Sequence, residues 1–436
     1  MNFYIVTFGC KVNQCESGDI HAAMLSSGFG FCDNMQDSDI VIINSCTVTH
    51  ESDRKLRQMI NKIKKFNINS ILVLTGCMPQ AAPEAAKKLK NINIIIGNTN
   101  KALIPESINS YLKNNNKIFD VKPIKNIKKF EISEVCRTPH RSRAFLKIED
   151  GCNRFCSYCI IPYARGEVRS KPLENIKKDA ERLSQSGYKE IVLVGINLSF
   201  YGKDLGCNLY DAVHTVCEIK GIERVRLGSL EPDLMNDDLI NKLSMESKLC
   251  PHFHLSLQSG SDEILKKMRR HYNRTEYLSV VEKLRLKFKS ATFTTDVMVG
   301  FPGETEENFA ETLDIIKKAR FLKVHVFPYS IRPGTLAAEM PNQLSRHVKS
   351  ERVKKAIEIS KKVSKIVLND FAGTKMGVLY ETFGKGDFYE GYTANYIHIK
   401  SKSEKDIRGK IVDTVLEKSD EIFVNGYLSG EISNNI

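Results

Sequence analysis

Three cysteines lie within a stretch of eight residues, Cys152-Asn-Arg-Phe-Cys156-Ser-Tyr-Cys159. This loop follows an apolar stretch that we expect to be a β-strand. Three thiolates on one loop can hold a cubane iron–sulfur cluster and leave one iron without a protein ligand, so that this iron can bind a small molecule. A closed structural zinc site would need four protein ligands. Zinc with a distant fourth ligand, and three unrelated thiols, are the alternatives.

A second set of three cysteines follows three separate strand-like runs. Cys10 ends the first run, Cys46 follows the second and Cys77 follows the third. The carboxyl ends of parallel strands share one edge of a sheet, so these thiols are expected to meet there. The pattern favours a second cluster over the alternative, which is small buried cysteines at strand ends.

The strands and helices that would position both sets of cysteines predict an α/β protein with a small β-domain at its end. Strands are expected at 3–8, 39–44, 70–75 and 93–96, with helices at 14–27, 51–66 and 82–89 between them. Six more strands are expected at 144–149, 190–194, 224–230, 253–258, 293–299 and 322–329, separated by helical patterns. Alternating βα units predict a parallel sheet first and then a partial barrel, whose site lies at the carboxyl ends of the strands.

A long basic helix is expected at 345–370, followed by short strands at 376–382, 389–392, 397–400, 409–416 and 422–428, which predict a small β-barrel. We therefore expect an N-terminal α/β domain over 1–112, a connector over 113–137, a barrel core over 138–370 and a β-barrel over 371–436. The connector can hold strands at 117–121 and 129–132.

Composition fits a cytoplasmic protein, because no secretory signal and no membrane-spanning run is visible. In a reducing compartment the 12 cysteines are metal ligands or free thiols rather than disulfides. The formal net charge of +13 suggests a polyanionic partner, with solvated surface charge as the alternative.

The central loop, with an aromatic residue (Tyr158) before its third cysteine, resembles the signature of the radical S-adenosylmethionine (SAM) enzymes. The resemblance implies a partial (βα)6 barrel and a [4Fe–4S] cluster held by Cys152, Cys156 and Cys159, whose open iron binds SAM. Reductive cleavage of SAM then yields a 5′-deoxyadenosyl radical that abstracts hydrogen. Candidate SAM contacts at strand ends are Tyr158, Asn197, Ser229, Glu231, Gln258, Gly300 and Gly303.

The N-terminal motifs Thr7-Phe-Gly-Cys10-Lys-Val-Asn-Gln14, Asn44-Ser-Cys46-Thr-Val-Thr49 and Thr75-Gly-Cys77-Met-Pro-Gln80 resemble those of the methylthiotransferases. That family joins this domain to a radical SAM core and a C-terminal TRAM barrel. The resemblance implies an auxiliary [4Fe–4S] cluster on Cys10, Cys46 and Cys77, one SAM as methyl donor and a second as radical source. It also implies an electron donor of flavodoxin or ferredoxin type and a sulfur source. The remaining cysteines are expected to be ordinary thiols: Cys15, Cys32, Cys136, Cys207, Cys217 and Cys250.

Within that family, the motif after Cys10 and the motif Gly195-Ile-Asn197 resemble the type that methylthiolates C2 of N6-threonylcarbamoyladenosine at position 37 of tRNA. The isopentenyladenosine and ribosomal-protein aspartate types are the alternatives, and a non-enzymatic iron–sulfur RNA-binding protein is a third. The tRNA anticodon loop would meet a basic platform on the long helix and the β-barrel, where aromatic residues stack on bases or form the barrel core. Candidate RNA contacts are Lys354, Lys355, Lys361, Lys362, Lys385, Lys402 and Arg408.

Overall fold

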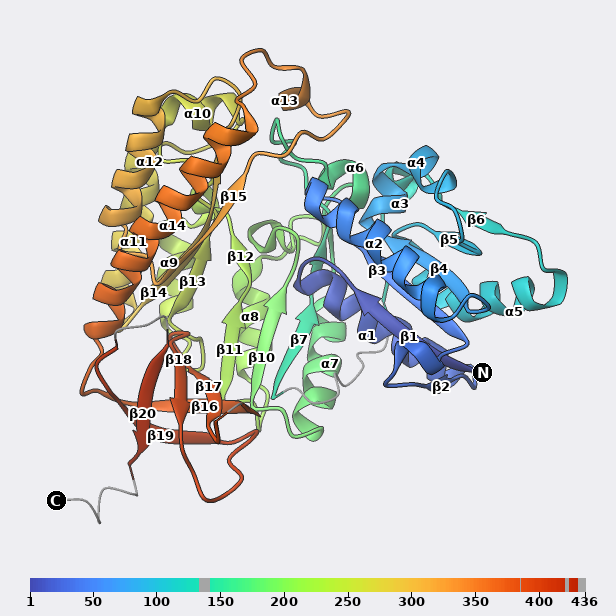
Figure 1. The fold of residues 1–436 in the computed structure, drawn as a ribbon. Helices are drawn as coiled ribbons and strands as arrows, with labels where there is room; N and C mark the ends of the chain where they lie inside the picture. Colours follow the sequence, from blue (N-terminus) through green and yellow to red (C-terminus); the bar gives the residue numbers. More distant parts are fainter. Residues whose placement is uncertain (133–141, 385, 420–422, 430–436) are drawn as a thin grey trace.

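The N-terminal domain is a six-stranded parallel sheet covered by helices on both faces (Figure 1). The computed structural model describes residues 1–132, 142–384, 386–419 and 423–429. The strands, in spatial order, are β2 (Gly30–Phe31), β1 (Asn2–Thr7), β3 (Ile40–Ser45), β4 (Ile71–Gly76), β5 (Ile94–Ile96) and β6 (Ile118–Asp120). The helices are α1 (Lys11–Ser26), α2 (His50–Phe66), α3 (Cys77–Ala81), α4 (Pro83–Lys87) and α5 (Ile104–Asn114).

The central strands of this sheet are apolar on both faces. Every residue of β3 and β4 is buried. Ile40 and Ile42 pack into one cluster with α1 and α5, and Val41 and Ile43 pack into another with α2. Side chains alternate between the faces of a strand, so a continuous Ile/Val run is what a sheet covered on both sides requires.

The sheet extends further along the chain than expected. β6 confirms the strand expected at 117–121, but it pairs with β5 in parallel and so belongs to the N-terminal sheet rather than to a separate connector. Helix α5, which the sequence analysis did not predict, leads into β6. The strand expected at 129–132 is not present; these residues are irregular and largely exposed. The helix expected at 82–89 is shorter, and α3 precedes it, starting at Cys77.

The core is an open barrel of parallel strands. The strands are β7 (Arg143–Lys147), β10 (Glu190–Val194), β11 (Arg224–Leu227), β12 (Ser229–Leu230), β13 (His252–Leu255), β14 (Thr292–Val299) and β15 (Lys323–Pro328). β11 and β12 are one expected strand interrupted at Gly228, so the six strands expected here are confirmed. Among the described residues β7 pairs only with β10, and β15 only with β14, which leaves the barrel open between these two strands.

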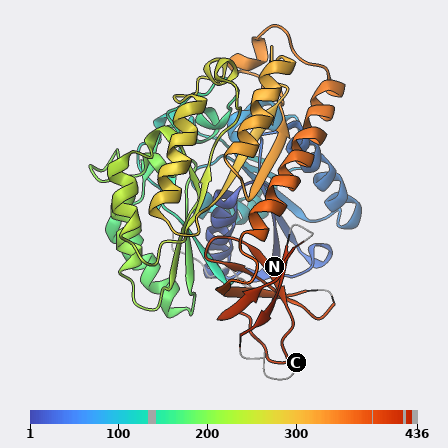
Figure 2. The ribbon, with the colours of Figure 1, turned by 90° about the vertical axis from the view of Figure 1, so that its left-hand side faces the viewer.

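Helices cover the outside of the core (Figures 1 and 2). They are α7 (Leu173–Gln185), α8 (Leu209–Cys217), α9 (Asp237–Ser244), α10 (Asp262–Lys267), α11 (Arg274–Lys287), α12 (Glu306–Lys318) and α14 (Arg346–Asn369). The short helices α6 (Ile161–Arg165) and α13 (Leu336–Glu339) and the short strands β8 (Glu149–Asp150) and β9 (Arg169–Ser170) belong to loops at the carboxyl ends of the strands. No helix in the described ranges is long and apolar enough to cross a bilayer.

The expected C-terminal β-barrel is confirmed. Its five strands close in the order β16 (Lys375–Phe383), β17 (Tyr389–Thr393), β18 (His398–Ser401), β20 (Val424–Leu428) and β19 (Ile411–Leu416). The barrel lies below the core (Figure 2), against the amino ends of its strands. Arg224 and Arg226 donate to the carbonyl oxygens of Gly377 and Ala394 at 2.7 and 2.8 Å.

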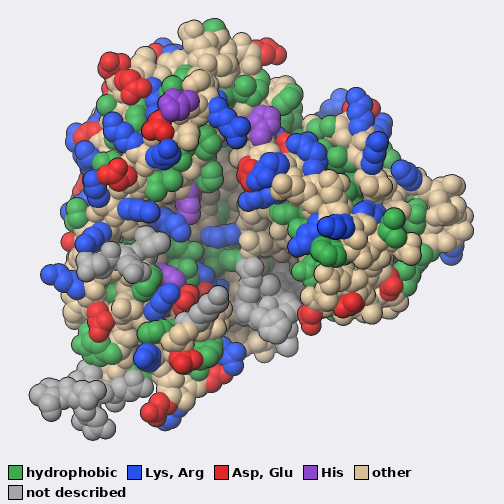
Figure 3. Space-filling view, viewed as in Figure 1, with side chains coloured by type: hydrophobic (Ala, Val, Ile, Leu, Met, Phe, Trp, Pro, Cys, Tyr) green, Lys and Arg blue, Asp and Glu red, His purple; other side chains and the backbone are tan. Residues whose placement is uncertain are grey.

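The N-terminal domain lies across the open side of the core (Figure 1). Helix α1 contacts β7 on one side of the opening, and α3 contacts α6. Beyond the other side, after β15, Arg332 pairs with Asp53 at 2.6 Å. A hollow lies between the two domains, and Lys, Arg and His side chains are visible in it (Figure 3).

Candidate active site

The loop that carries Cys152, Cys156 and Cys159 begins directly after β8. Gly151 starts it with a left-handed backbone (φ +88°), and a Cβ at this position would lie 1.9 Å from the carbonyl oxygen of Glu167. Only glycine allows this approach. The Cys152 N–H donates to the Gly166 carbonyl at 3.0 Å, and the Cys159 N–H to the Cys156 carbonyl at 2.9 Å. The loop is therefore held tightly at both ends.

The three thiols of this loop lie close enough to influence one another. Burial, together with a smaller effect of charge on Cys156, raises the pKa of Cys152 to about 11. Burial also raises the pKa of Cys159, and charges on Cys156 and Cys152 act in the same direction. Three thiols that repel one another as thiolates need cations between them to ionise together, and bound iron supplies such charge.

Polar donors and acceptors surround these sulfurs. Arg270 Nη1 lies 3.4 Å from Cys156 Sγ, and Asn197 Nδ2 lies 3.9 Å from Cys152 Sγ. Asn197 Oδ1 and Glu149 Oε1 are buried and have no partner in the described residues. Burial raises the pKa of Glu149 to about 8 and so favours the protonated carboxyl. Two unsatisfied oxygens beside the cysteine loop fit a site that a polar ligand such as SAM completes.

Cys10, Cys46 and Cys77 come together at the carboxyl edge of the N-terminal sheet. A Cβ on Gly9 would lie 3.0 Å from Cys46 Cβ. Burial, together with smaller effects of charges on Cys77 and Cys10, raises the pKa of Cys46 to about 11. Burial also raises the pKa of Cys10, while Arg165 lowers it. The expected meeting point of the three strands thus exists; the ligand role of its thiols stays a prediction.

Helix ends point at this N-terminal triad. Cys10 is the N-cap of α1, Cys77 is the first residue of α3, and α2 begins four residues after Cys46. Amino ends of helices carry partial positive charge and favour thiolates and anionic clusters. No group of three or more His, Cys, Asp or Glu side chains in the described part of the chain is arranged around a single metal ion. In a cubane each thiolate would bind a different iron, and the ligand role of both triads stays a prediction.

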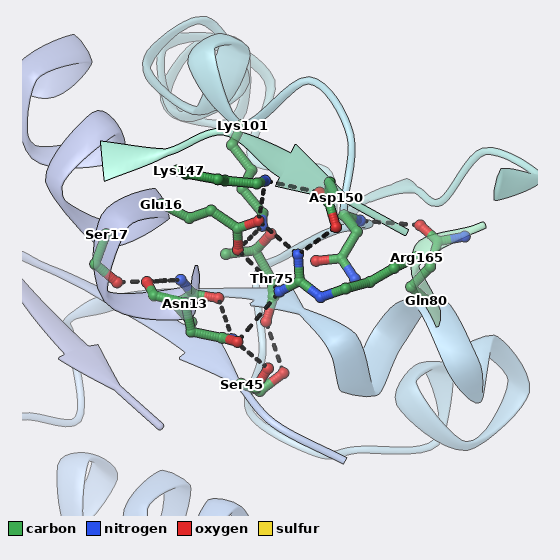
Figure 4. A network of polar contacts seen from close by, with 12 residues as sticks. Asn13, Glu16, Ser17, Ser45, Thr75, Gln80, Lys101, Lys147, Asp150 and Arg165 are labelled. Carbon is green, nitrogen blue, oxygen red and sulfur yellow. Dashed lines mark hydrogen bonds and ion pairs between the residues drawn. The ribbon is translucent and has the colours of Figure 1, made fainter. Parts of the chain in front are cut away.

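A buried ion network joins the two triads (Figure 4). Arg165 Nη1 donates to Glu16 Oε1 at 2.7 Å and to Asp150 Oδ1 at 3.0 Å. Lys147 pairs with the same two carboxylates at 2.8 and 2.7 Å, and Lys101 pairs with Glu16 at 2.5 Å. Burial raises the pKa of Glu16, but Arg165, Lys101 and Lys147 together lower it well below its ordinary value. Glu16 belongs to the N-terminal domain and Asp150 precedes the central loop, so the network fixes one triad relative to the other.

Sequence reasoning missed the central members of this network and also Arg270. Arg165 lies in the motif Cys159-Ile-Ile-Pro-Tyr-Ala-Arg165-Gly, where the residue type alone gave no role. Arg270 reaches Cys156 across 114 residues of sequence and also pairs with Glu231. Such pairs are created by packing and leave no local signal.

The expected SAM contacts Tyr158, Ser229, Glu231 and Gln258 lie around the carboxyl ends of the core strands. Tyr158 packs against a small cluster that includes Phe301. Ser229 Oγ lies 3.0 Å from Ser256 Oγ, and Glu231 is held by Arg270. Gln258 has a left-handed backbone (φ +64°) and follows β13. Their contact with SAM stays a prediction.

The two glycines after β14, expected as SAM contacts, have left-handed backbones, and one of them packs against a helix. Gly300 and Gly303 are both left-handed, at φ +73° and +71°. A Cβ on Gly300 would lie 2.4 Å from Lys349 Cγ of α14, whereas one on Gly303 would meet only Lys267 Nζ, at 3.4 Å. At Gly300 the close neighbour is therefore a helix rather than open space. A SAM contact at these positions also stays a prediction.

The expected RNA contacts are exposed, and several have acidic neighbours. Lys354 and Lys362 pair with Glu351 and Glu358 one helical turn away, at 3.0 and 2.6 Å. Arg408 pairs with Asp406 at 2.6 Å. The other described candidates are Lys355 and Lys361 on α14 and Lys402 on the C-terminal barrel. Lys385 and Cys136 lie outside the described residues. The other cysteines not assigned to clusters are free thiols: Cys15, Cys32, Cys207, Cys217 and Cys250.

The core and the N-terminal domain each match a known protein family. Residues 146–316 match the Radical SAM superfamily, and residues 2–97 match Uncharacterized protein family UPF0004. The chain is 36% identical to a threonylcarbamoyladenosine tRNA methylthiotransferase MtaB of Bacillus subtilis, over 95% of this chain and 93% of that protein. It is 34% identical to a tRNA-2-methylthio-N(6)-dimethylallyladenosine synthase of Pelotomaculum thermopropionicum, over 98% and 97%.

A solved structure shares the fold. The radical SAM methyltransferase TsrM from Kitasatospora setae, with cobalamin and a [4Fe–4S] cluster bound, aligns with a TM-score of 0.58 at 12% identity, covering 77% of each chain. At that identity the likeness concerns the fold alone. The sequence identity to the methylthiotransferases, which extends over nearly the whole chain, is stronger evidence of family membership. It agrees with the two cysteine triads, the open barrel and the closed C-terminal barrel. The chain belongs to the radical SAM methylthiotransferase family, whose members are enzymes that use SAM and [4Fe–4S] clusters.

Proposed function

We propose that this enzyme methylthiolates C2 of N6-threonylcarbamoyladenosine at position 37 of tRNA and forms 2-methylthio-N6-threonylcarbamoyladenosine. One observation carries the proposal. A chain with two separated cysteine triads at one cleft aligns over 95% of its length with a relative named for this activity. A radical SAM centre alone would need one triad; the second supports sulfur insertion.

The two triads have different tasks in this proposal. Cys152, Cys156 and Cys159 hold the cluster that binds SAM, and Cys10, Cys46 and Cys77 hold the auxiliary cluster. The SAM-bound cluster, when reduced, supplies a carbon radical strong enough to abstract hydrogen from an inert C–H bond. Asn197 and Arg270 orient the Cys152 and Cys156 sulfurs through the contacts described above. The N-terminal domain covers the open side of the barrel and keeps bulk water from the reacting atoms.

The tRNA reaches this cleft through its anticodon loop. The C2 atom of a stacked base is not accessible, so the target base leaves the stack and enters the hollow between the domains. The exposed basic residues of α14 and of the C-terminal barrel, Lys354, Lys355, Lys361, Lys362, Lys402 and Arg408, hold the phosphate backbone. A reductant of flavodoxin or ferredoxin type and a sulfur source complete the reaction.

Mass analysis of tRNA nucleosides tests the proposal. A strain without this gene is expected to lose 2-methylthio-N6-threonylcarbamoyladenosine and regain it with the wild-type gene. Cys156→Ser and Cys46→Ser genes are both expected to fail. With purified protein, SAM and dithionite, Cys156→Ser abolishes formation of 5′-deoxyadenosine, whereas Cys46→Ser retains part of it, because only the first triad binds SAM. Undiminished product in the deletion strain, or equal loss of 5′-deoxyadenosine in both variants, would contradict the assignment.

A second substrate has support of similar strength. Relatives named for N6-dimethylallyladenosine are 34–36% identical over 96–98% of this chain. The same nucleoside analysis separates the two, because the dimethylallyl product has a different mass.

A further inference from the structure

Lys11 is a cation at the domain junction that has no partner in the protein. It follows Cys10 directly and is the first residue of α1. In the described residues its amine makes no hydrogen bond and no ion pair, and its side chain is partly buried. An ammonium group withdrawn from water loses hydration that a neighbouring anion normally replaces. Lys11 lacks such an anion.

The charged groups around Lys11 are already paired with each other. They are Arg143, Arg226 and Glu190, together with the phenol of Tyr396. Arg226 binds Glu190 through two hydrogen bonds of 2.7 and 3.2 Å. Arg143 binds Glu381 through two more, of 2.7 and 2.8 Å. Arg224 also lies 3.8 Å from Glu190, so the carboxylates closest to Lys11 are already shared among arginines.

His252 and His325 also lie within electrostatic range of Lys11. Asp296, the acid that faces His325, lies 3.6 Å from His254. The junction combines residues from all three domains: Lys11 from the first, Arg143 and Arg226 from the core, and Tyr396 from the C-terminal barrel. Lys, Arg and His side chains are visible in the hollow between the N-terminal domain and the core (Figure 3). Counted together, four cations (Lys11, Arg143, Arg224 and Arg226) face three carboxylates (Glu190, Glu381 and Asp296), which leaves one positive charge that suits a small anionic group.

We propose that Lys11 binds the carboxylate of the threonylcarbamoyl group and thereby selects this substrate over adenosines whose N6 substituent is uncharged. The inference rests on the proposed function, which supplies a substrate with one carboxylate on its base. The Lys11 Nζ donates to a carboxylate oxygen, and the Tyr396 phenol lies close enough to act electrostatically on the same amine. Because Lys11 is adjacent to Cys10, a base held in this way lies beside the N-terminal triad. The phosphate backbone is a second source of oxygen anions, but it follows the surface, whereas Lys11 lies beneath three domains.

Binding of short anticodon stem-loops to the protein with both clusters tests the inference. Three loops differ only at position 37: threonylcarbamoyladenosine, its neutral methyl ester, and unmodified adenosine. Lys11→Gln is expected to weaken binding of the acid form by roughly ten- to a hundredfold, the range of a charge-assisted hydrogen bond, and to leave the ester and adenosine loops unchanged. Lys11→Arg keeps part of the preference. Lys88→Gln, which removes an exposed lysine from the same domain, is the matched control.

Each outcome is decisive. Equal weakening with all three loops would assign Lys11 to a phosphate and overturn the inference, as would unchanged binding of the acid form. An unchanged iron–sulfur absorbance and thermal midpoint show that Lys11→Gln is folded. If the wild-type enzyme fails to methylthiolate the acid form, the proposed function itself is wrong. If it succeeds while Lys11→Gln keeps the preference, only the role of Lys11 is wrong.

Discussion

Arg165 is the residue that both triads share. Its side chain is fully buried, and it binds Glu16 and Asp150 while its charge acts on Cys77 and Cys10. Four cations, Lys101, Lys147, Arg165 and Arg169, surround these two carboxylates. A cluster held by three thiolates adds negative charge next to Arg165. Arg165 is thus a positioning residue that also balances charge.

Replacement of Arg165 by Met is expected to destabilise the protein by about 3–5 kcal/mol, because it leaves two buried carboxylates with fewer partners. It is also expected to lower the reduction potential of the N-terminal cluster, since a nearby cation favours the reduced form. Arg165→Lys restores part of the potential. Thermal unfolding and a redox titration followed by electron paramagnetic resonance measure the two effects. A stable Arg165→Met protein with an unchanged potential would contradict this role.

At the scale of elements, the central cysteine loop depends on its first residue. Gly151 is left-handed, and no Cβ fits beside the Glu167 carbonyl. Gly187, at the end of α7, has a nearly identical φ of +87° but nothing within 4 Å of a Cβ. The two glycines therefore separate backbone strain from steric overlap.

Gly151→Ala is expected to lower the thermal midpoint and the iron content of the purified protein, because the loop must move to avoid the overlap. Gly187→Ala has the strain alone, roughly 1–3 kcal/mol, and keeps its iron. Iron and sulfide analysis together with thermal unfolding checks this pair. Equal iron content in both variants would show that the loop tolerates the change.

Strands could be predicted from the sequence wherever a continuous run of apolar residues is buried. The first four residues of β3 and of β4 are all apolar, and each core strand ends in a polar or glycine-rich turn. The meeting of Cys10, Cys46 and Cys77 was predictable because parallel strands share a carboxyl edge. The strand that became β6 was expected, but it was assigned to a connector because it is short and follows a polar stretch with three asparagines. The partners of Lys11, Arg165 and Arg270 depend on which distant segments pack together, and no local pattern encodes that.

At the scale of the whole molecule, His252 marks the junction of core and C-terminal barrel. Its ring stacks on Tyr396 at 4.4 Å, and its Nε2 lies 3.0 Å from Thr294 Oγ1. Its Nδ1 is buried without a partner in the described residues. Burial, Arg226 and Lys11 lower the pKa of His252 well below its ordinary value. The folded protein therefore keeps His252 neutral.

This neutral state makes stability depend on pH. The unfolded chain protonates His252 near pH 6.5, whereas the folded chain does so only at lower pH. The contribution of neutral His252 to the free energy of unfolding is present in full above pH 6.5. It is lost as the pH falls below that value, by at most about 1.4 kcal/mol per pH unit. His252→Asn is expected to flatten the fall of the thermal midpoint between pH 7 and 5.5, relative to an exposed control, His271→Asn. Parallel curves for the two variants would contradict the assignment.

The ion network between Glu16 and Arg165 also has a consequence for synthesis. The two residues are 149 positions apart, so at 5–20 residues per second a ribosome makes Glu16 roughly 7–30 s before its partner. During that interval the N-terminal sheet can fold, but the Glu16 carboxylate still lacks its partner, the Arg165 guanidinium. Until Arg165 is made, the thiols of Cys10, Cys46 and Cys77 therefore lack the positive charge that balances a bound cluster. We therefore expect iron–sulfur insertion at Cys10, Cys46 and Cys77 to follow the synthesis of Arg165 and its packing against Glu16.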